Sequence, residues 1–171
     1  MRMLRLFVRP IDTLSEWSGR LVSILIPLTV AVITYEVVVR YAFRAPTIWA
    51  HETSIFLLGY CGMLAGAYVL KRNEHIRVDI VYGRLSPRTR AILDLITSPL
   101  FFFIMALIIY EGLKAGMLSL RINEHTASAW GPPLAHFRLI IPAGAFLLFL
   151  QAIPNWIRNL YLAIKNTELP I

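Results

Sequence analysis

Residues 49–90 read WAHETSIFLLGYCGMLAGAYVLKRNEHIRVDIVYGRLSPRTR, and this stretch decides the fold class. Its run from Thr53 to Leu70 holds 18 consecutive uncharged, mostly apolar residues. A helix rises about 1.5 Å per residue, so this run covers roughly 27 Å, close to the ~30 Å hydrocarbon core of a bilayer. The following segment, residues 71–90, carries six Lys or Arg against two acids. We therefore predict a membrane span at about residues 53–70, followed by a basic amphipathic loop.

The composition of the whole chain supports a membrane protein. Hydrophobic residues make up 57% of the 171 positions and charged residues 16%, with a mean hydropathy of +0.63. A soluble domain has about 25% charged residues, so this chain lacks the polar surface of one. The net charge is +7, but the basic residues cluster between apolar runs without interleaved aromatic residues. That distribution is typical of membrane orientation, so we expect membrane lipids and no nucleic acid as partners.

Three further apolar runs predict membrane-spanning helices at about residues 21–39, 91–117 and 139–157. Together with residues 53–70, they indicate an all-α fold. We expect an integral membrane four-helix bundle that forms a single membrane domain over residues 1–171.

Local signals mark the start of the third helix and the loop after it. Ser86 and Pro87 suit the N-cap and the first position of a helix, because Ser accepts a backbone hydrogen bond and Pro has no N–H to leave unpaired. The sequence WGPP at residues 130–133 is incompatible with regular helix. It belongs to a polar loop predicted over residues 118–137.

The N-terminal segment, residues 1–18, is basic and has Arg residues at helical spacing. Pro10 is expected to interrupt a helix here, and Asp12 is a suitable N-cap for the next turn. Two interpretations remain open: a short helix lying on the membrane surface, or a frayed basic terminus that contributes only to orientation.

The distribution of basic residues predicts the orientation in the membrane. Of the 17 Lys and Arg residues, twelve lie in the N-terminal segment, in residues 71–90 and in the C-terminal tail, and five lie on the other side. Positively charged loops stay in the cytoplasm. Both termini and the amphipathic loop 71–90 are therefore predicted to be cytoplasmic, and the loop 118–137 to be periplasmic.

Three charged residues near span ends are candidates for structural ion pairs. A lone charge at the centre of a spanning helix costs about 3 kcal/mol, so charges near spans tend to be paired. Glu36 lies one helical turn before Arg40, where an intrahelical pair forms readily. Glu52 begins the next span and is positioned to compete for Arg40 or Arg44. The alternative, a proton or ion pathway, is less favoured because no acid occupies the centre of any span.

No motif indicates catalysis, a metal or a cofactor. The four histidines lie in loops or at helix ends, whereas paired haem ligation in a membrane bundle uses histidines inside facing helices. The single cysteine, Cys61, lies within a span and has no neighbours of metal-ligand type. There is no Ser/His/Asp spacing and no phosphate-binding glycine loop. We expect no enzymatic activity, no catalytic residue, no metal site and no cofactor.

One set of residues resembles a known family. The set comprises Glu36, Arg40, Trp49, Glu52, His75, Arg77 and Asp79. A glycine-rich helix separates W-x2-E from H-I-R-V-D, and the likeness resumes later in the chain at SAWGPP and IPAGAFLL. In total the likeness extends over about residues 15 to 160. This pattern resembles the small (DctQ-like) transmembrane subunit of tripartite ATP-independent periplasmic (TRAP) transporters.

The resemblance implies a function in secondary transport across the bacterial inner membrane. In that family a large, elevator-type membrane subunit carries the substrate and sodium sites, and a periplasmic substrate-binding protein delivers a solute that is often a carboxylate. The resemblance implies that this chain braces the large subunit, expected here as a separate chain, and helps dock the binding protein. Candidate docking residues in the periplasmic loop are Arg121, Glu124 and Trp130.

Two other classes of function stay open on the sequence. A small self-contained transporter or channel would need polar groups along a shared pathway. A membrane anchor subunit of a respiratory complex would also be a small four-helix protein, but the lack of histidines inside the spans argues against a haem-binding anchor.

Overall fold

The structure, a computed structural model, describes residues 2–72 and 85–165, with side chains from residue 8 onward. It contains four helices, listed in chain order: α1 (Arg2–Ala42), α2 (Ala50–Lys71), α4 (Pro87–Arg121) and α5 (Ala135–Lys165). All four are long and apolar enough to cross a membrane. Within the described ranges there is no strand, and the one isolated β-bridge joins His125 to Pro133. The prediction of an all-α fold with four spanning helices is confirmed.

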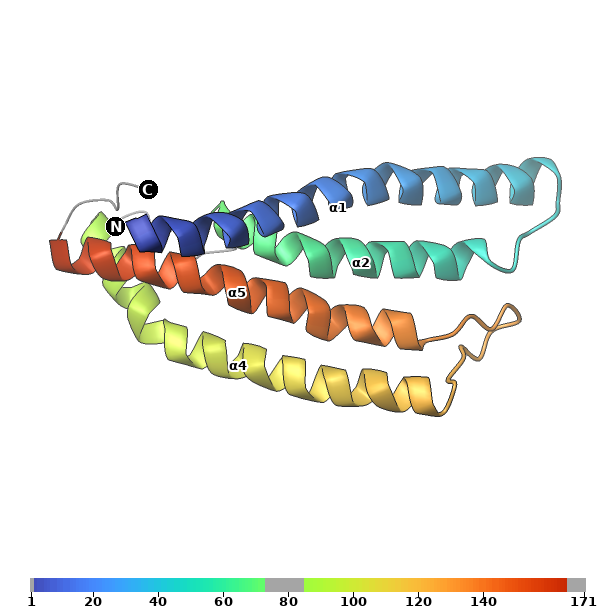
Figure 1. The fold of residues 1–171 in the computed structure, drawn as a ribbon. Helices are drawn as coiled ribbons and strands as arrows, with labels where there is room; N and C mark the ends of the chain where they lie inside the picture. The colour runs from blue at the N-terminus through green and yellow to red at the C-terminus, as the bar shows by residue number, and fades with distance from the viewer. Residues whose placement is uncertain (1, 73–84, 166–171) are drawn as a thin grey trace.

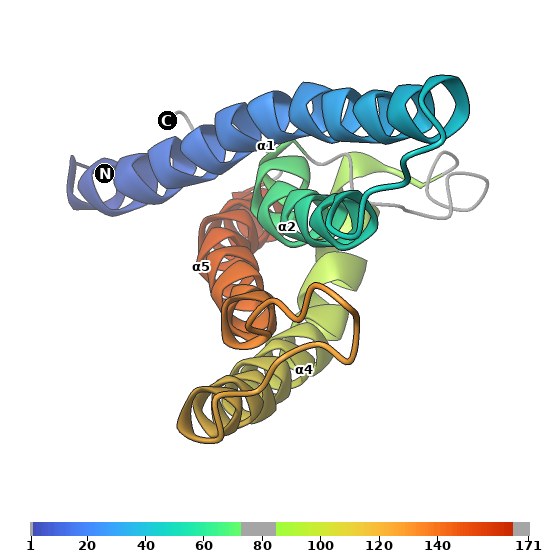
Figure 2. The ribbon, with the colours of Figure 1, turned by 90° about the vertical axis from the view of Figure 1, so that its right-hand side faces the viewer.

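The helices form an open row rather than a closed ring. α1 packs on α2, α2 on α5, and α5 on α4, with a smaller contact between α1 and α5. Figure 2 looks onto the row from the end that holds the two described connections and shows the four helices in this succession. α5 is the most buried of the four helices: 33% of its most apolar stretch is buried, against 11% for α1 and α2 and 0% for α4. Most large apolar side chains of α1 and α4 are exposed, whereas most of those of α2 are buried or half-buried.

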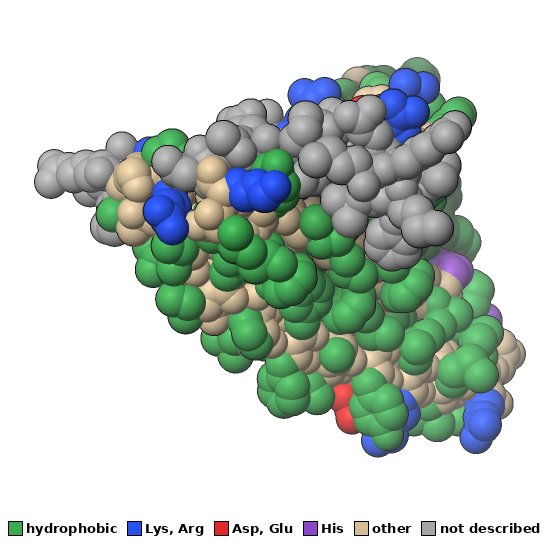
Figure 3. Space-filling model, turned by 60° about the vertical axis from the view of Figure 1, so that its left-hand side comes forward, with side chains coloured by type: hydrophobic (Ala, Val, Ile, Leu, Met, Phe, Trp, Pro, Cys, Tyr) green, Lys and Arg blue, Asp and Glu red, His purple; other side chains and the backbone are tan. Residues whose placement is uncertain are grey.

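The two ends of the row differ, and we name them by what they contain. The terminal end is where α1 begins and α5 ends, and the loop end carries the connections 43–49 and 122–134 (Figure 1). Hydrophobic side chains cover the middle of the face in Figure 3, while Lys and Arg side chains gather toward its margins. This banding fits an apolar slab between two polar surfaces.

Glycines allow α5 to approach its neighbours closely. A Cβ atom at Gly144 of α5 would lie 2.7 Å from the backbone oxygen of Met63 in α2. A Cβ atom at Gly59 of α2 would lie 2.4 Å from the ring of Phe137. Small residues at helix contacts matter most in membranes, where packing replaces the hydrophobic effect as the driving force.

The start of α4 follows the local sequence signals. Ser86 is the N-cap, its hydroxyl oxygen accepts a hydrogen bond from the Thr89 N–H at 3.2 Å, and Pro87 opens the helix. This prediction is confirmed. The 130–133 segment is outside the helices, as expected.

The connection between α4 and α5 is shorter than the predicted loop 118–137. α4 continues to Arg121 and α5 already begins at Ala135, so the connection covers residues 122–134. The reason is local: nothing in residues 118–121 breaks a helix, and Asn123, with φ of 48°, is where the chain turns away. α2 likewise includes Lys71, which the sequence assigned to the basic loop, whereas α4 begins at Pro87, as its capping signals predicted.

The predicted interruption at Pro10 is wrong. α1 runs without a break from Arg2 to Ala42, and Pro10 lies inside it. A proline removes one backbone hydrogen bond of the helix. The helix tolerates this loss because Asp12, in the following turn, is bound by side chains of α2 and α5. Asp12 is therefore not an N-cap but an interior residue of α1.

Candidate functional site

The most extensive polar contacts of the molecule lie at the terminal end and centre on Asp12. Its Oδ1 accepts a hydrogen bond from the Gln151 amide at 2.9 Å, and its Oδ2 accepts one from the Arg158 guanidinium at 2.6 Å. The Gln151 oxygen in turn accepts a hydrogen bond from the Ser15 hydroxyl at 2.6 Å. Gln151 is 0% exposed and Ser15 is 2% exposed. These contacts fasten α1 to α5 inside the protein.

Lys71, the last residue of α2, joins the same group. Its ammonium donates to the backbone oxygen of Asp12 at 3.1 Å and forms an ion pair with Glu16 at 2.6 Å. The Asn155 amide donates to the backbone oxygen of Leu70 at 2.9 Å, which satisfies one of the carbonyls left unpaired at the end of α2. Three helices therefore meet in one polar network. We call it the terminal polar cluster, made up of Asp12, Ser15, Glu16, Lys71, Gln151 and Arg158.

This cluster was missed by sequence reasoning. Gln151 is the only glutamine of the chain and lies inside an apolar run, which is a signal for a buried hydrogen-bonding role. Its partners are 136 and 139 positions away, so no local pattern points to them.

At the loop end, Glu36 organises the connection between α1 and α2. Its carboxylate accepts hydrogen bonds from Arg40 Nε at 2.9 Å and from the Thr47 backbone N–H at 3.1 Å, and it also binds the Thr47 hydroxyl. Arg40 Nη2 lies 2.5 Å from the carboxylate. Glu36 is buried, whereas the Arg40 side chain is 50% exposed. The pair therefore shapes residues 43–49 and presents a half-exposed guanidinium beside them.

Glu52 does not join this pair. Among the described residues no ion pair to Glu52 is present, and its Oε2 accepts a hydrogen bond from the Thr126 hydroxyl at 3.2 Å. Arg44, the other predicted partner of Glu52, forms no described ion pair with it and has a positive φ of 54°. Glu52 thus links the start of α2 to the 122–134 connection.

The three proposed docking residues occupy different environments. Glu124 forms an ion pair with Arg138 at 2.5 Å, and its side chain is only 25% exposed. Arg121, the last residue of α4, is exposed, and Trp130 is 42% exposed. His125 Nδ1 contacts the backbone oxygen of Gly131 at 2.6 Å, so the connection is folded on itself. It presents Arg121 and Trp130 outward while Glu124 holds it to α5.

Of the remaining motif positions, the structure describes Trp49. Trp49 stacks on Tyr35 of α1, with ring centroids 5.8 Å apart. His75, Arg77 and Asp79 lie outside the described residues.

The described residues contain no cluster of metal-ligand type. No three His, Cys, Asp or Glu side chains gather there in a way that would hold a metal ion. Cys61 is buried, and His136 contacts the Tyr60 hydroxyl at 2.6 Å. The polar arrangements described above hold helices and connections in place.

Comparison with known proteins identifies the family. Residues 29–161, more than three quarters of the chain, match the family model described as tripartite ATP-independent periplasmic transporters, DctQ component. The chain belongs to the DctQ family. The matched range includes the Glu36–Arg40 pair, the loop-end connections and three of the six residues of the terminal polar cluster, Lys71, Gln151 and Arg158.

A curated relative extends the comparison. The DctQ-family chain is 26% identical over 104 residues to the sialic acid TRAP transporter permease protein SiaT of Haemophilus influenzae (strain 86-028NP). The alignment covers 61% of this chain and 16% of that relative, so the chain spans only a small part of the relative's length.

Family membership and fold together fix the general role. This protein belongs to a family described as the DctQ component of TRAP transporters, and its four described helices are long and apolar enough to make it a multi-pass membrane protein. The family description names a component of a transport system.

Proposed function

We propose that this DctQ-family protein is the small membrane subunit of a TRAP transporter in the bacterial inner membrane. It braces a large elevator-type membrane subunit and helps dock the periplasmic substrate-binding protein during sodium-coupled uptake. The solute is a small carboxylate-bearing compound. The name of the SiaT relative refers to sialic acid, which supports an acidic solute here.

The terminal polar cluster is the observation that carries the bracing role. Its buried groups bind one another across α1, α2 and α5, rather than lining a shared path for a solute. A bracing element beside a moving subunit has to keep its own helices in fixed register, and hydrogen bonds between helices do that within a membrane. The outward-facing apolar sides of the open row supply surface for a large membrane partner.

The docking role rests on the 122–134 connection and the end of α4. Arg121 and Trp130 are exposed, and both residue types are enriched at protein interfaces. Glu124 holds the connection to α5 through its ion pair with Arg138. Docking is therefore proposed for Arg121 and Trp130, with Glu124 in a positioning role.

Reconstitution into liposomes tests both roles. With the large subunit, the binding protein and a sodium gradient, the wild-type chain should support uptake, and this chain alone should not transport. An Arg121→Glu, Trp130→Ala variant should reduce uptake several-fold while the two membrane subunits still purify together. Arg44→Asp is the matched control, since it reverses a charge in the other loop-end connection and Asp tolerates the positive φ found there.

The outcomes separate the two parts of the proposal. Full-rate uptake by the large subunit and binding protein without this chain would show that bracing is wrong. Normal uptake by the Arg121→Glu, Trp130→Ala variant would contradict the docking role alone.

A further inference from the structure

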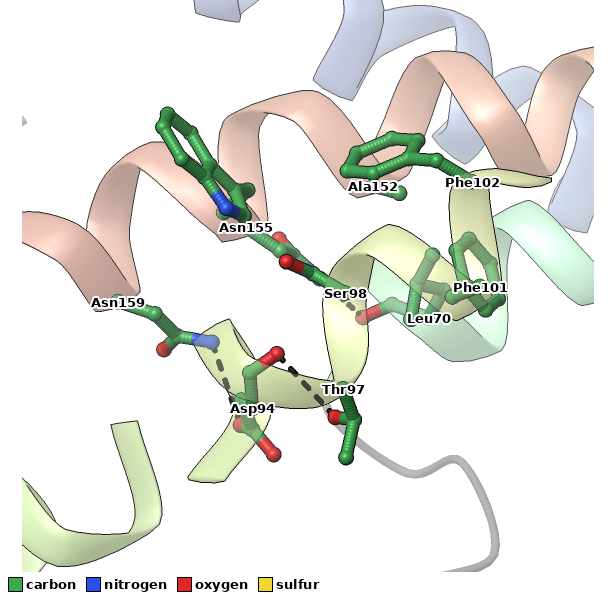
Figure 4. A pocket seen from close by; sticks show the side chains of 10 residues that line it. Leu70, Asp94, Thr97, Ser98, Phe101, Phe102, Ala152, Asn155 and Asn159 are labelled. Carbon is green, nitrogen blue, oxygen red and sulfur yellow. Dashed lines mark hydrogen bonds between the residues drawn. The ribbon is translucent and has the colours of Figure 1, made fainter. Parts of the chain in front are cut away.

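Two pockets near the terminal end differ in the charges that line them. Figure 4 shows the first, between the end of α2 and the facing sides of α4 and α5, where Asp94 accepts a hydrogen bond from Asn159. Its described lining contains no Lys or Arg. The second pocket, of ≈ 290 Å³, lies between α1 and the end of α2, and Arg20 and Arg72 both line it. Of the two, the second is the one suited to an anion.

Aromatic rings hold both guanidinium groups of this second pocket. The Arg72 guanidinium lies 4.6 Å from the centroid of the Tyr68 ring, and the Arg20 guanidinium lies 5.5 Å from that of Trp17. Gly19 allows the Tyr68 ring to lie against α1, because a Cβ atom at this position would come within 2.4 Å of the ring. Stacking on a ring uses the face of a guanidinium and leaves the N–H groups at its edge to bind a phosphate.

The charges around the pocket do not cancel. Glu16, a member of the terminal polar cluster, is the acid in the described lining, and it forms an ion pair with Lys71 at 2.6 Å. Asp12, the preceding acid of α1, is also in an ion pair. Among the described residues, neither Arg20 nor Arg72 forms an ion pair with an acid. Three cations therefore lie beside one carboxylate, which leaves a surplus of positive charge.

The pocket continues into an exposed apolar side of α1. Its lining on this helix ends at Ser23, and the residues three and seven positions farther along the same side, Ile26 and Val30, are 53% and 58% exposed. By the predicted spans, Arg20 and Arg72 lie at the cytoplasmic surface of the membrane. The two exposed apolar side chains lie within the hydrocarbon. Cationic groups and an apolar surface thus follow each other in the order of the headgroup and acyl chains of a membrane lipid.

We propose that this pocket binds the headgroup of one anionic phospholipid of the phosphatidylglycerol type. The guanidinium N–H groups of Arg20 and Arg72 donate to the phosphate oxygens, a contact for which the planar fork of arginine is well shaped. The acyl chains lie along the side of α1 that carries Ile26 and Val30. A headgroup with an ammonium group would be repelled by the surplus of positive charge, which favours a lipid with a net negative charge.

Acceptors in the lining suit the hydroxyl groups of a glycerol headgroup. The Ser23 hydroxyl donates its proton to the backbone oxygen of Arg20 at 2.6 Å, so its own oxygen is left as an acceptor. Glu16 binds Lys71 through Oε1, which leaves Oε2 as a second acceptor. The pocket therefore offers donors for a phosphate and acceptors for the alcohol attached to it.

Native mass spectrometry of the full chain tests the proposal. The protein is purified in mild detergent and titrated separately with phosphatidylglycerol, phosphatidylethanolamine and phosphatidylcholine. One phosphatidylglycerol molecule should bind, with a Kd well below the values for the two zwitterionic lipids. Soluble glycerol 3-phosphate in excess should not displace the lipid, because it shares the phosphate but lacks acyl chains.

Variants that remove one charge place the lipid in the pocket. Arg20→Gln and Arg72→Gln should each raise the Kd for phosphatidylglycerol about tenfold, because each removes charge-assisted hydrogen bonds. Arg9→Gln is the matched control, since Arg9 is exposed on the same helix outside the described lining, and the Kd should stay unchanged. If Arg72→Gln fails to fold, Arg72→Lys keeps the charge without the planar fork and should still weaken binding.

Four results would overturn the proposal. Equal affinity of the wild-type chain for the three lipids would indicate nonspecific lipid at the protein surface. Unchanged affinity in folded Arg20→Gln and Arg72→Gln variants would exclude the pocket. An equal loss in Arg9→Gln and Arg20→Gln would show that overall charge, rather than this pocket, attracts the lipid. Displacement by glycerol 3-phosphate would show a site for a soluble phosphate ester instead of a lipid.

Discussion

The ion pairs at the two ends of the helix row differ in what they connect. At the terminal end, Arg158 pairs with Asp12 and Lys71 pairs with Glu16, and each pair joins two different helices. At the loop end, Glu36 pairs with Arg40 one turn away in the same helix, and Glu124 pairs with Arg138 at the start of α5. The ion pairs at the terminal end therefore hold helices to one another, while those at the loop end shape the connections between helices.

The largest contrast between the ends should appear in their accessibility from the two sides of the membrane. In a Cys61→Ala background, a cysteine replacing Glu74 should react with an impermeant maleimide only from the cytoplasm. A cysteine replacing Ala127, an exposed residue of the 122–134 connection, should react only from the outside. The physical reason is the excess of Lys and Arg near the terminal end. Labelling is compared in intact cells and in inverted vesicles.

Ala129→Cys, on the same connection, is the control and should label as Ala127→Cys does. Labelling of the Glu74 and Ala127 positions from one and the same side would contradict a single membrane crossing by α4, which lies between them.

Gln151→Leu should cause the larger of two stability losses. The substitution leaves Ser15 without its acceptor and Asp12 without one of its donors, both in a largely buried setting. Each unsatisfied buried group costs about 1–3 kcal/mol, so the free energy of unfolding should fall by about 2 kcal/mol or more. Unfolding in mixed micelles with a rising fraction of SDS measures the change.

Thr13→Val is the control for Gln151→Leu. Thr13 is exposed, and its hydroxyl donates to a carbonyl one turn earlier in the same helix, so the loss should stay within about 0.5 kcal/mol. If Gln151→Leu were no more destabilising than Thr13→Val, the terminal polar cluster would have no special role in holding the helices.

Arg40→Ala should have the smallest effect on stability. The Arg40 side chain is half exposed, and Glu36 keeps both of its contacts to Thr47 when Arg40 is removed. Pairs of this kind contribute up to about 1 kcal/mol. The expected change is a looser 43–49 connection, measured as faster proteolysis there, with the free energy of unfolding lowered by less than Gln151→Leu lowers it.

Arg44→Asn removes a neighbouring charge while keeping a residue that accepts a positive φ, and it should leave proteolysis unchanged. Equal proteolysis of the Arg40→Ala and Arg44→Asn variants would remove the reason to single out the Glu36–Arg40 pair.

Sequence reasoning succeeded where the determining interactions are local. Ser86 and Pro87 start α4 because the capping bond runs only three residues along the chain. The four apolar runs predicted four helices because length and hydrophobicity are enough for a bilayer span. The prediction of a helix break at Pro10 was wrong because side chains of α2 and α5 hold the next turn of α1, and these contacts are not local in sequence.

The candidate site was less predictable for the same reason. The position of Glu36 one turn before Arg40 could be read from spacing, but its contact with Thr47 required knowing how the chain turns after α1. Gln151 binds groups near the opposite end of the sequence, and its partners follow from the order of helices in the row. The family resemblance supplied the transport role, which no periodicity in the chain contains.

The open row of helices also has a consequence for how the protein is made. α1 and α2 follow each other in the chain and pack together, and so do α4 and α5, so each pair is a helical hairpin that can form soon after its own insertion. The principal contact between the hairpins is that of α2 with α5, where Gly144 meets Met63 and Gly59 meets Phe137. Helix insertion and helix association are separable stages in membranes. A bulkier residue at Gly144 would therefore leave two correctly inserted hairpins that fail to join, a defect of biogenesis that topology measurements alone would not detect.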